Sequence, residues 1–350
     1  MLSSKNPSVF FWMSILLLIV ASSSCKTTRT TQKTTSDNLN IELSKADSIY
    51  DKTDSLLTVE KHSPNQDSVS IEVYRLLKDT ISINPDKSYL PPNQGKYLQQ
   101  EVNEILQDAD VTFGNLEGVI LNEGGDAKNC KNPKLCYIFR SPEDIASNLV
   151  TAGFDVLSTA NNHAGDFGNP GRKNTMRVLD SLEIEHAGLL EKPTATFIRD
   201  GMKYGFAAFA PNTGTVSINV KIVSYLDSIS DIVIISFHGG AEGSKHQHVT
   251  RKNEYFYGEN RGNVYAFSHT LVDAGADIIF GHGPHVTRAV EVYKNRIIAY
   301  SLGNFCTYAR FSLRGDNGLA PLLKVFTNAE GNFLYGEITP IIQLGAGGPS

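Results

Sequence analysis

The sequence has little of what marks several common protein classes. Among 350 residues there are one tryptophan, four methionines and four cysteines, and 32 Lys and Arg stand against 37 Asp and Glu, a formal net charge of −5. Such a mildly acidic chain does not suggest the concentrated basic face of a nucleic-acid-binding protein, which disfavours helicases, polymerases and transcription factors. A hydrophobic content of 41% and a charged content of 20% are those of a soluble domain with ample core.

The sequence offers no long hydrophobic run at its N-terminus either. Lys5 precedes an apolar stretch from Phe10 to Ala21, which is short for a transmembrane helix but typical of a secretory signal. Small residues lead to Cys25, although Ser22 stands where a lipoprotein signal most often has Leu. We therefore expect a signal segment over 1–25, acylation of Cys25 and a membrane-anchored lipoprotein outside the cytoplasm of a bacterial envelope. The alternatives are an ordinary cleaved signal or an uncleaved anchor, with Cys25 incidental.

The other cysteines are too few for a closed zinc site. Cys130 and Cys136 bracket a loop-like stretch, and in an exported protein a local disulfide between them is the expected state. The rival interpretation, half of a zinc site, lacks a second cysteine pair. Cys306 lies in an apolar segment and is interpreted as a small buried hydrophobic residue.

Composition and periodicity divide the rest of the chain into a linker and a domain. Residues 26–86 are polar and lack sustained apolar periodicity, which predicts a flexible or poorly ordered linker. From 87 to 350, apolar strand patterns alternate with helical ones such as 96–108 and 263–274, which indicates an α/β fold. The last three apolar segments, 297–301, 322–327 and 333–342, have little helix between them and predict strands that close a sheet sandwich.

Polar side chains follow one predicted strand after another. In chain order the segments are Gly114-Asn115-Leu116-Glu117, Asn161-Asn162-His163 with Asp166, His238-Gly239-Gly240 with Glu242, Gly281-His282-Gly283-Pro284-His285, and Ser301-Leu302-Gly303-Asn304-Phe305. One histidine after a strand is more often structural than functional, but the carboxyl ends of parallel strands meet at one rim of a sheet. We therefore expect these side chains to converge, and their mixed nitrogen and oxygen donors suit one or two Mn, Zn or Fe ions better than calcium.

These five ordered motifs resemble those of the CapA family, proteins named for capsule and poly-γ-glutamate synthesis. The resemblance implies a calcineurin-like metallophosphatase fold, a two-sheet α/β sandwich of the four-layer type with metals held by loops at strand ends. It implies that His163 is the general acid or oxyanion stabiliser and that Asp166 orients it. The implied metal ligands are Glu117, Asn162, His238, His282 and His285. The residues implied to support these ligands or to contact substrate are Asn115, Asn161, Glu242, Asn304 and Arg288.

The chain departs from the family pattern at its first motif. Family members open the domain with Gly-Asp-x-Met, whose Asp is expected to bind metal, and this sequence has no such motif. Asp79 is the substitute in the corresponding region, but Lys78 beside it and the lack of glycine argue against that role. One metal ligand is therefore missing or replaced, and the segment 217–222 is shortened as well.

Three functions remain open on the sequence. The first is a metal-dependent hydrolase, acting on a phosphoester or an acyl bond, in the synthesis or export of an anionic extracellular polymer together with capsule machinery. The second is a non-catalytic envelope protein that binds the polymer or the machinery, with Arg288, Arg310 and Arg314 as candidate carboxylate or phosphate contacts. The third, a periplasmic binding protein, explains a tether but not the clustered histidines.

Overall fold

The computed structural model describes residues 90–129, 137–210, 216–308, 312–319 and 321–343, together with the backbone of two short strands, β1 (Ser14–Leu18) and β2 (Val69–Ile71). The chain divides into two units, residues 1–22 with 68–350 and residues 23–67. The second unit lies outside the described residues, so the elements named below all belong to the first.

A six-stranded sheet is the larger layer of this unit. Its order is β14-β15-β13-β10-β9-β8, with four parallel central strands and an antiparallel strand at each edge. The strands are β8 (Thr194–Arg199), β9 (Met202–Phe209), β10 (Ile232–His238), β13 (Ile278–His282), β14 (Val290–Tyr293) and β15 (Arg296–Ala299). All seven residues of β10 are buried, because both faces of a parallel sheet are covered.

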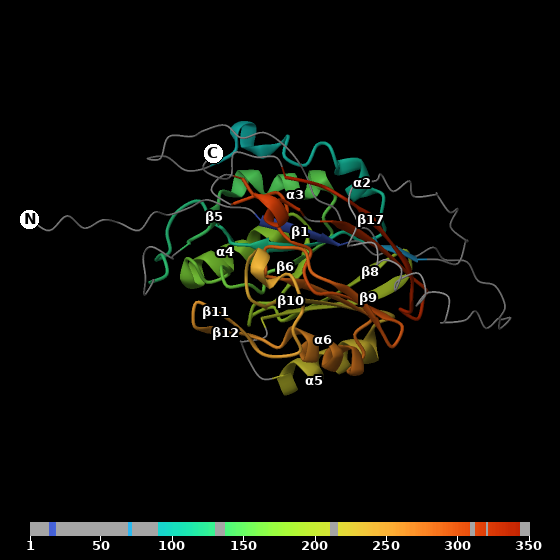
Figure 1. Cartoon of the computed structure of the whole chain (residues 1–350). Helices are drawn as coiled ribbons and strands as arrows, with labels where there is room; N and C mark the ends of the chain where they lie inside the picture. The colour runs from blue at the N-terminus through green and yellow to red at the C-terminus, as the bar shows by residue number, and fades with distance from the viewer. Residues whose placement is uncertain are drawn as a thin grey trace, which may run out of the picture. The chain divides into compact units, whose positions relative to one another are not determined.

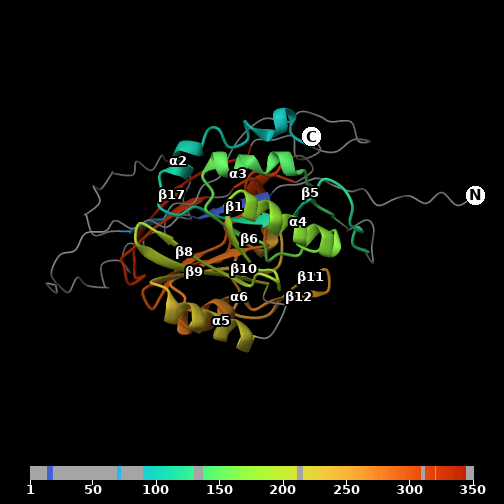
Figure 2. The same cartoon turned by 180° about the vertical axis from the view of Figure 1, so that it is seen from behind.

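A four-stranded sheet with order β1-β3-β6-β7 forms the second layer. Strands β3 (Phe113–Glu117), β6 (Val156–Ser158) and β7 (Glu185–Ala187) run parallel, and β1 pairs antiparallel with β3. Helices α3 (Ser147–Ala152) and α4 (Gly168–Ser181) lie on its outer side, whereas α5 (Val216–Ile229) and α6 (Val264–Asp273) cover the outer face of the six-stranded sheet (Figures 1 and 2). Helix α6 begins where the Asn263 side chain accepts a hydrogen bond from the Ala266 amide.

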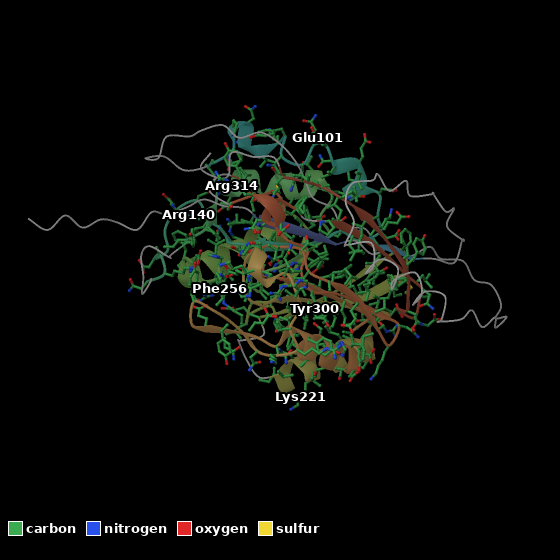
Figure 3. The ribbon with its side chains drawn as sticks, in the orientation of Figure 1. Glu101, Arg140, Lys221, Phe256, Tyr300 and Arg314 are labelled. Atoms are coloured by element: carbon green, nitrogen blue, oxygen red, sulfur yellow. The ribbon has the colours of Figure 1, made fainter. Side chains whose placement is uncertain are left out.

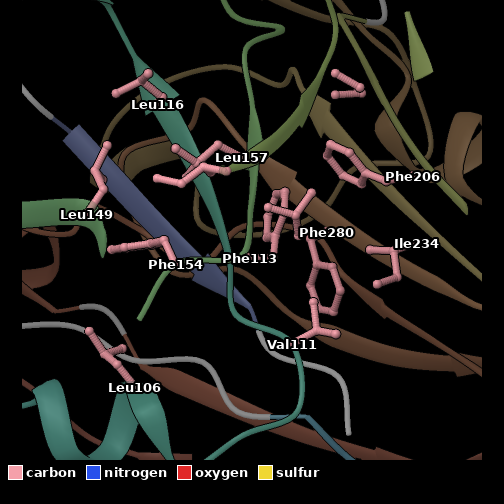
Figure 4. Packing of buried hydrophobic residues seen from close by; sticks show 14 of the residues in the cluster. Leu106, Val111, Phe113, Leu116, Leu149, Phe154, Leu157, Phe206, Ile234 and Phe280 are labelled. Carbon is pink, nitrogen blue, oxygen red and sulfur yellow. The ribbon is translucent and has the colours of Figure 1, made fainter. Parts of the chain in front are cut away.

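The main hydrophobic core lies between the two sheets. Phe113 of β3 packs against Phe206 of β9 and Phe280 of β13, with ring centroids 5.4 and 6.1 Å apart (Figure 4). Leu157 of β6 and Ile234 of β10 are buried in the same cluster. A second cluster fills the space between the six-stranded sheet and helices α5 and α6.

Smaller elements surround these layers. Their bounds are η1 (Pro92–Gly95), α2 (Asn103–Gln107), β4 (Val119–Ile120), β5 (Arg140–Ser141), η3 (Glu143–Ile145), η4 (Ser244–His246), β11 (Glu254–Phe256), β12 (Glu259–Gly262), η5 (Gly315–Gly318), β16 (Leu322–Thr327) and β17 (Phe333–Thr339). Strands β17, β16 and β2 form a three-stranded sheet, β11 and β12 a hairpin, and β4 and β5 a parallel pair.

The mixed α/β class predicted from the sequence is confirmed, and two of its elements need correction. The helix expected over 96–108 is regular only from Asn103 to Gln107, because three-residue turns, such as Val102 N–H to Gln99 O at 3.0 Å, precede it. The strand expected to end at Phe113 begins there instead. Asn115 and Glu117 therefore lie inside a fully buried strand rather than in the loop after it.

Candidate functional site

The candidate site lies at the rim where three buried strands end. Glu117 is the last residue of β3, His238 of β10 and His282 of β13. His238 and His282 are register partners in adjacent parallel strands, so both side chains leave the sheet at the same level. The strands end there because glycines follow, at Gly118, Gly239 and Gly283.

Three imidazoles surround one carboxylate oxygen of Glu117. The Oε1 atom lies 3.9 Å from His163 Nε2, 4.0 Å from His238 Nε2 and 3.8 Å from His285 Nε2. Glu117 is only 4% exposed, and Oε1 has no hydrogen-bond partner among the described residues. The structure therefore brings side chains from four separate segments to one buried point.

His282 lies next to His238 in the neighbouring strand and faces β3. Its ring stacks on Phe113 with centroids 5.7 Å apart, and in the described part of the chain neither ring nitrogen has a hydrogen-bond partner. Burial lowers the pKa of His282 to about 3. Burial, reinforced by the neighbouring His285 and His282, also holds the pKa of His238 well below its usual range. Both imidazoles are therefore neutral at physiological pH.

A sharp turn carries His285 into the cluster, as its spacing from His282 requires. Gly283 has a φ of 111° and His285 itself a φ of 58°, so the chain reverses within three residues. His285 Nδ1 lies 2.5 Å from Asn304 Oδ1, which fixes Nδ1–H as the donor and leaves the Nε2 lone pair toward Glu117. Burial alone would lower the pKa of His285, but the Glu117 and Glu242 carboxylates and the Asn304 contact outweigh it and raise that pKa.

Asp166 orients His163, the residue on the opposite side of Glu117. The carboxylate accepts from His163 Nδ1 at 2.8 Å and from the Phe139 amide at 2.6 Å, and it pairs with Lys128 at 2.6 Å. The Phe139 ring stacks on the imidazole with centroids 3.9 Å apart. His163 is thus held on its flat face and at Nδ1, with Nε2 directed at the cluster.

The neighbouring asparagines differ from expectation. Asn161 is buried, donates to the Leu116 carbonyl at 2.8 Å and accepts from the His163 amide at 3.0 Å, and it lies 3.4 Å from Asn115 Oδ1. Asn162, expected among the metal ligands, is exposed. Asn161, and not Asn162, is therefore hydrogen-bonded to β3, the strand that carries Glu117.

Arg288 is committed to a partner rather than free to recognise substrate. Its guanidinium forms a two-pronged ion pair with Glu254 at 3.0 and 2.8 Å and donates to the Ala241 carbonyl at 3.0 Å. Glu242 is likewise tied to Arg261 at 2.8 Å. These pairs hold the loop that follows His238, so Arg288 and Glu242 are placed where they support the site.

Comparison with known proteins identifies the family of the chain. A family model described as "Bacterial capsule synthesis protein PGA_cap" matches residues 71–309, more than half of the chain. The chain belongs to this family. The match includes every strand end that contributes to the cluster around Glu117.

Two relatives show how far apart members of the family lie. "Capsule biosynthesis protein CapA" of Bacillus anthracis is 30% identical over 235 residues, which cover 60% of this chain and 53% of that protein. "PGA biosynthesis protein CapA" of Bacillus subtilis (strain 168) is 28% identical over 263 residues, covering 69% of this chain and 64% of that one. The chain thus spans between about half and two thirds of the length of these family members.

Solved structures resemble the chain more distantly. A hypothetical protein from Thermus thermophilus superposes with a TM-score of 0.43 at 13% identity, over 70% of this chain and 92% of that one. A 5'-nucleotidase precursor from the same organism gives a TM-score of 0.35 at 12% identity, over 59% and 45%. At such scores neither likeness carries an argument.

The nitrogen and oxygen donors near Glu117 are of the kinds that bind transition metals. They are not arranged as a complete coordination site. Within the described ranges, no group of three or more His, Cys, Asp or Glu side chains is arranged so that it could hold a metal ion. Yet Glu117 Oε1 and both His282 nitrogens are buried without hydrogen-bond partners, which is costly unless something binds them. Ligand atoms about 2.1 Å from one ion lie roughly 3 to 4 Å apart. The separations at Glu117 fall at the upper end of that range.

Several expectations lie outside the described residues. These are the signal segment apart from the β1 backbone, Cys25, the linker apart from β2, Asp79, Arg310, and the pair Cys130 and Cys136. Among the helices that are described, none is long and apolar enough to cross a membrane. Cys306 is buried as a free thiol, as expected.

Several residues that support the site carry no signal in the sequence. Lys128 and Phe139 come from the loop between β4 and β5, and Glu254 from the β11–β12 hairpin. Gln343 accepts from the Thr307 amide at 2.9 Å and donates to the Asn304 carbonyl oxygen at 3.4 Å. Their roles depend on contacts between segments far apart in sequence.

Proposed function

We propose that this chain is a metal-dependent hydrolase of the metallophosphatase type, acting at the bacterial envelope in the synthesis or export of an anionic polymer. The observation that supports this most is the convergence of three imidazole Nε2 atoms on the unpartnered Oε1 of Glu117. A buried carboxylate oxygen left without a donor among the described residues points to a cation as its partner.

Glu117, His238, His282 and His285 are the residues that would hold Mn, Zn or Fe. When bound, the metal would polarise a phosphoryl or acyl oxygen and lower the pKa of a water molecule. Asn304 accepts from Nδ1–H of His285, which directs Nε2 of that ring toward Glu117. Phe113 fixes the ring of His282 from the core side.

His163 is the proton-transfer group in this proposal. Because Asp166 accepts from Nδ1, the Nε2 atom is free to donate to a leaving group or to an oxyanion when the ring is protonated. The buried Asp166 carboxylate holds the ring at Nδ1 and the Phe139 ring limits its rotation. Lys128 holds Asp166 in place by pairing with its other oxygen at 2.6 Å.

The setting of the reaction rests on the relatives and on the N-terminal sequence. The Bacillus relatives carry names that refer to capsule and PGA biosynthesis. We propose that this chain takes part in a similar process, anchored through Cys25, with the polymer and its synthesis or export machinery as partners. Mass spectrometry of membrane-extracted protein should find a lipidated Cys25, and Cys25→Ala should move the protein to the soluble fraction.

Metal content and turnover of the purified full chain test the catalytic part. The wild type should retain a transition metal after dialysis and hydrolyse a chromogenic phosphodiester or acyl ester, whereas His238→Ala should lose both. His269→Gln is the control, because this α6 histidine pairs with Glu291 away from the cluster, and it should change neither. Asp166→Asn should keep the metal and lower turnover at least about 100-fold. A wild type without metal or turnover would refute the proposal.

A second candidate is a non-catalytic envelope protein that binds the polymer or the machinery. Two observations favour it: the Gly-Asp-x-Met motif is missing, and no group of side chains in the described part already has the arrangement of a metal site. Polymer retention by a wild type that binds no metal would select this candidate.

A further inference from the structure

The segment that carries Asn304 is irregular in backbone and buried at the edge of the candidate site. Between Gly303 and Thr307 the chain forms neither helix nor strand, and two residues have left-handed backbone, Gly303 with a φ of 76° and Cys306 with a φ of 51°. A non-glycine residue in that region is strained, so contacts from other segments must hold the backbone there. Whatever holds this segment also holds His285, because Asn304 contacts that ring.

Both ends of the Asn304 carboxamide engage His285. The Nδ2 atom donates to the His285 carbonyl at 3.2 Å, so Oδ1 is the atom that faces the ring and accepts from Nδ1 at 2.5 Å. On the other side of the ring, Nε2 lies 3.8 Å from Glu117 Oε1. Because the ring is held at Nδ1, a displacement of the Asn304 backbone changes the position of Nε2 relative to Glu117.

Gln343 holds the backbone of this segment from a distant part of the chain. Its Oε1 atom accepts from the Thr307 amide at 2.9 Å and from the Thr307 hydroxyl at 3.0 Å, and its Nε2 atom donates to the Asn304 carbonyl at 3.4 Å. Gln343 is 6% exposed, whereas Ile342 before it is 50% exposed. A buried carboxamide thus gives an irregular backbone both the donor and the acceptor that a neighbouring strand gives in a sheet.

A tight turn holds Gln343 itself in place. The Gln343 amide donates to the Gly318 carbonyl at 2.9 Å, at the end of η5. Arg314, which is labelled in Figure 3, stands immediately before this turn. Only glycine fits at position 318, because a Cβ there would stand 2.2 Å from the Leu313 carbonyl oxygen. The backbone of Gln343 is therefore fixed by the turn, which leaves its side chain to hold Asn304.

We propose that Gln343 is a positioning residue of the candidate site, which sets the place of His285 Nε2 relative to Glu117. In the described part of the chain its hydrogen bonds go to Thr307, Asn304 and Gly318, so it acts on His285 through Asn304. It lies beyond residues 71–309, which the family model matches. The inference rests on the proposed function in one respect, since it takes His285 to be one of the residues that would hold the metal.

Exchange of the His285 Nδ1 proton with water, followed by NMR on the full chain labelled with ¹⁵N-histidine, tests this role. His285→Gln identifies the signal. Gln343→Met keeps the length of the side chain but removes its hydrogen bonds, so it should speed the exchange at least about tenfold. The matched control is Thr175→Val, which removes a buried hydroxyl with two hydrogen-bond partners on α4 and should stay within about twofold of the wild type. Both variants should lower the urea midpoint, so a difference in exchange between them is local to His285.

A second variant and a second measurement complete the test. Gln343→Glu still accepts from Thr307 but repels the Asn304 carbonyl, so it should also speed the exchange, and it replaces Gln343→Met if that variant does not fold. In metal-loaded protein, Gln343→Met should release the metal to a chelator about tenfold faster than the wild type. The role is overturned if the wild type shows no protected Nδ1 proton, if Gln343→Met and Thr175→Val exchange alike, or if metal release is unchanged. A wild type that binds no metal refutes the catalytic proposal and leaves the exchange result standing.

Discussion

Replacing Arg288 by methionine should destabilise the chain more than any single change at a surface charge. Arg288 is 4% exposed and Glu254 is 6% exposed, so neither charge can recover its hydration when the other is removed. Breaking such a buried pair costs about 3–5 kcal/mol, because one charge stays buried without a partner. Arg288→Met also removes the donor to the Ala241 carbonyl, which loosens the loop that follows His238.

Urea unfolding of the full chain, followed by circular dichroism, measures this cost. Arg177→Met is the matched control, because its pair with Glu143 is exposed and should be worth at most about 1 kcal/mol. The double variant Arg288→Met with Glu254→Met should recover much of the loss, since it removes both buried charges. Equal effects of Arg288→Met and Arg177→Met, or a double variant as costly as the sum of its singles, would show that the pair is not buried as described.

Three further predictions concern stability. Burial raises the pKa of Asp277 to about 6, so between pH 4 and 6 the folded state keeps a proton that the unfolded state has released. Stability should therefore fall by up to about 3 kcal/mol as pH rises through this window, and Asp277→Asn should flatten that slope in urea titrations at several pH values. A Cβ at Gly281 would stand 2.2 Å from the Tyr300 carbonyl oxygen, so Gly281→Ala should lower the melting temperature by several degrees, whereas Gly165→Ala, which meets only a flexible side chain at 3.2 Å, should not. Gln343→Glu should cost about 1–3 kcal/mol in urea unfolding, because its carboxamide donates to a backbone carbonyl 3.4 Å away and a carboxylate would repel that oxygen; an unchanged midpoint would contradict the contact.

The meeting of the site residues at one edge of the sheets was predictable from the sequence, because it follows from the topology. Glu117, His238 and His282 each end a strand, and parallel strands place such ends together whatever packs around them. The turn at Gly283 was predictable for the same local reason, since two histidines three residues apart meet one point only if the chain reverses there.

The residues that support the site were not predictable, because their roles depend on contacts between segments far apart in the sequence. Nothing in the sequence distinguishes Asn161 from Asn162, and the choice between them depends on which one faces β3. Glu254 and Arg288 are separated by 34 residues, so nothing in the sequence indicates that they pair. The early end expected for β3 had a similar cause, since Asn115 and Glu117 are polar residues that only a functional site would bury in a strand.

The missing first motif bears on both candidate functions through the number of carboxylates at the site. Among the described residues near the cluster, Asp166 is engaged with His163 and Lys128, and Glu242 with Arg261, which leaves Glu117 as the free acidic donor. One carboxylate with imidazoles would hold a divalent ion less tightly than two carboxylates with the same imidazoles. Weak retention of the metal is therefore the expected consequence of this departure from the family pattern, and the metal content of the purified full chain after dialysis measures it.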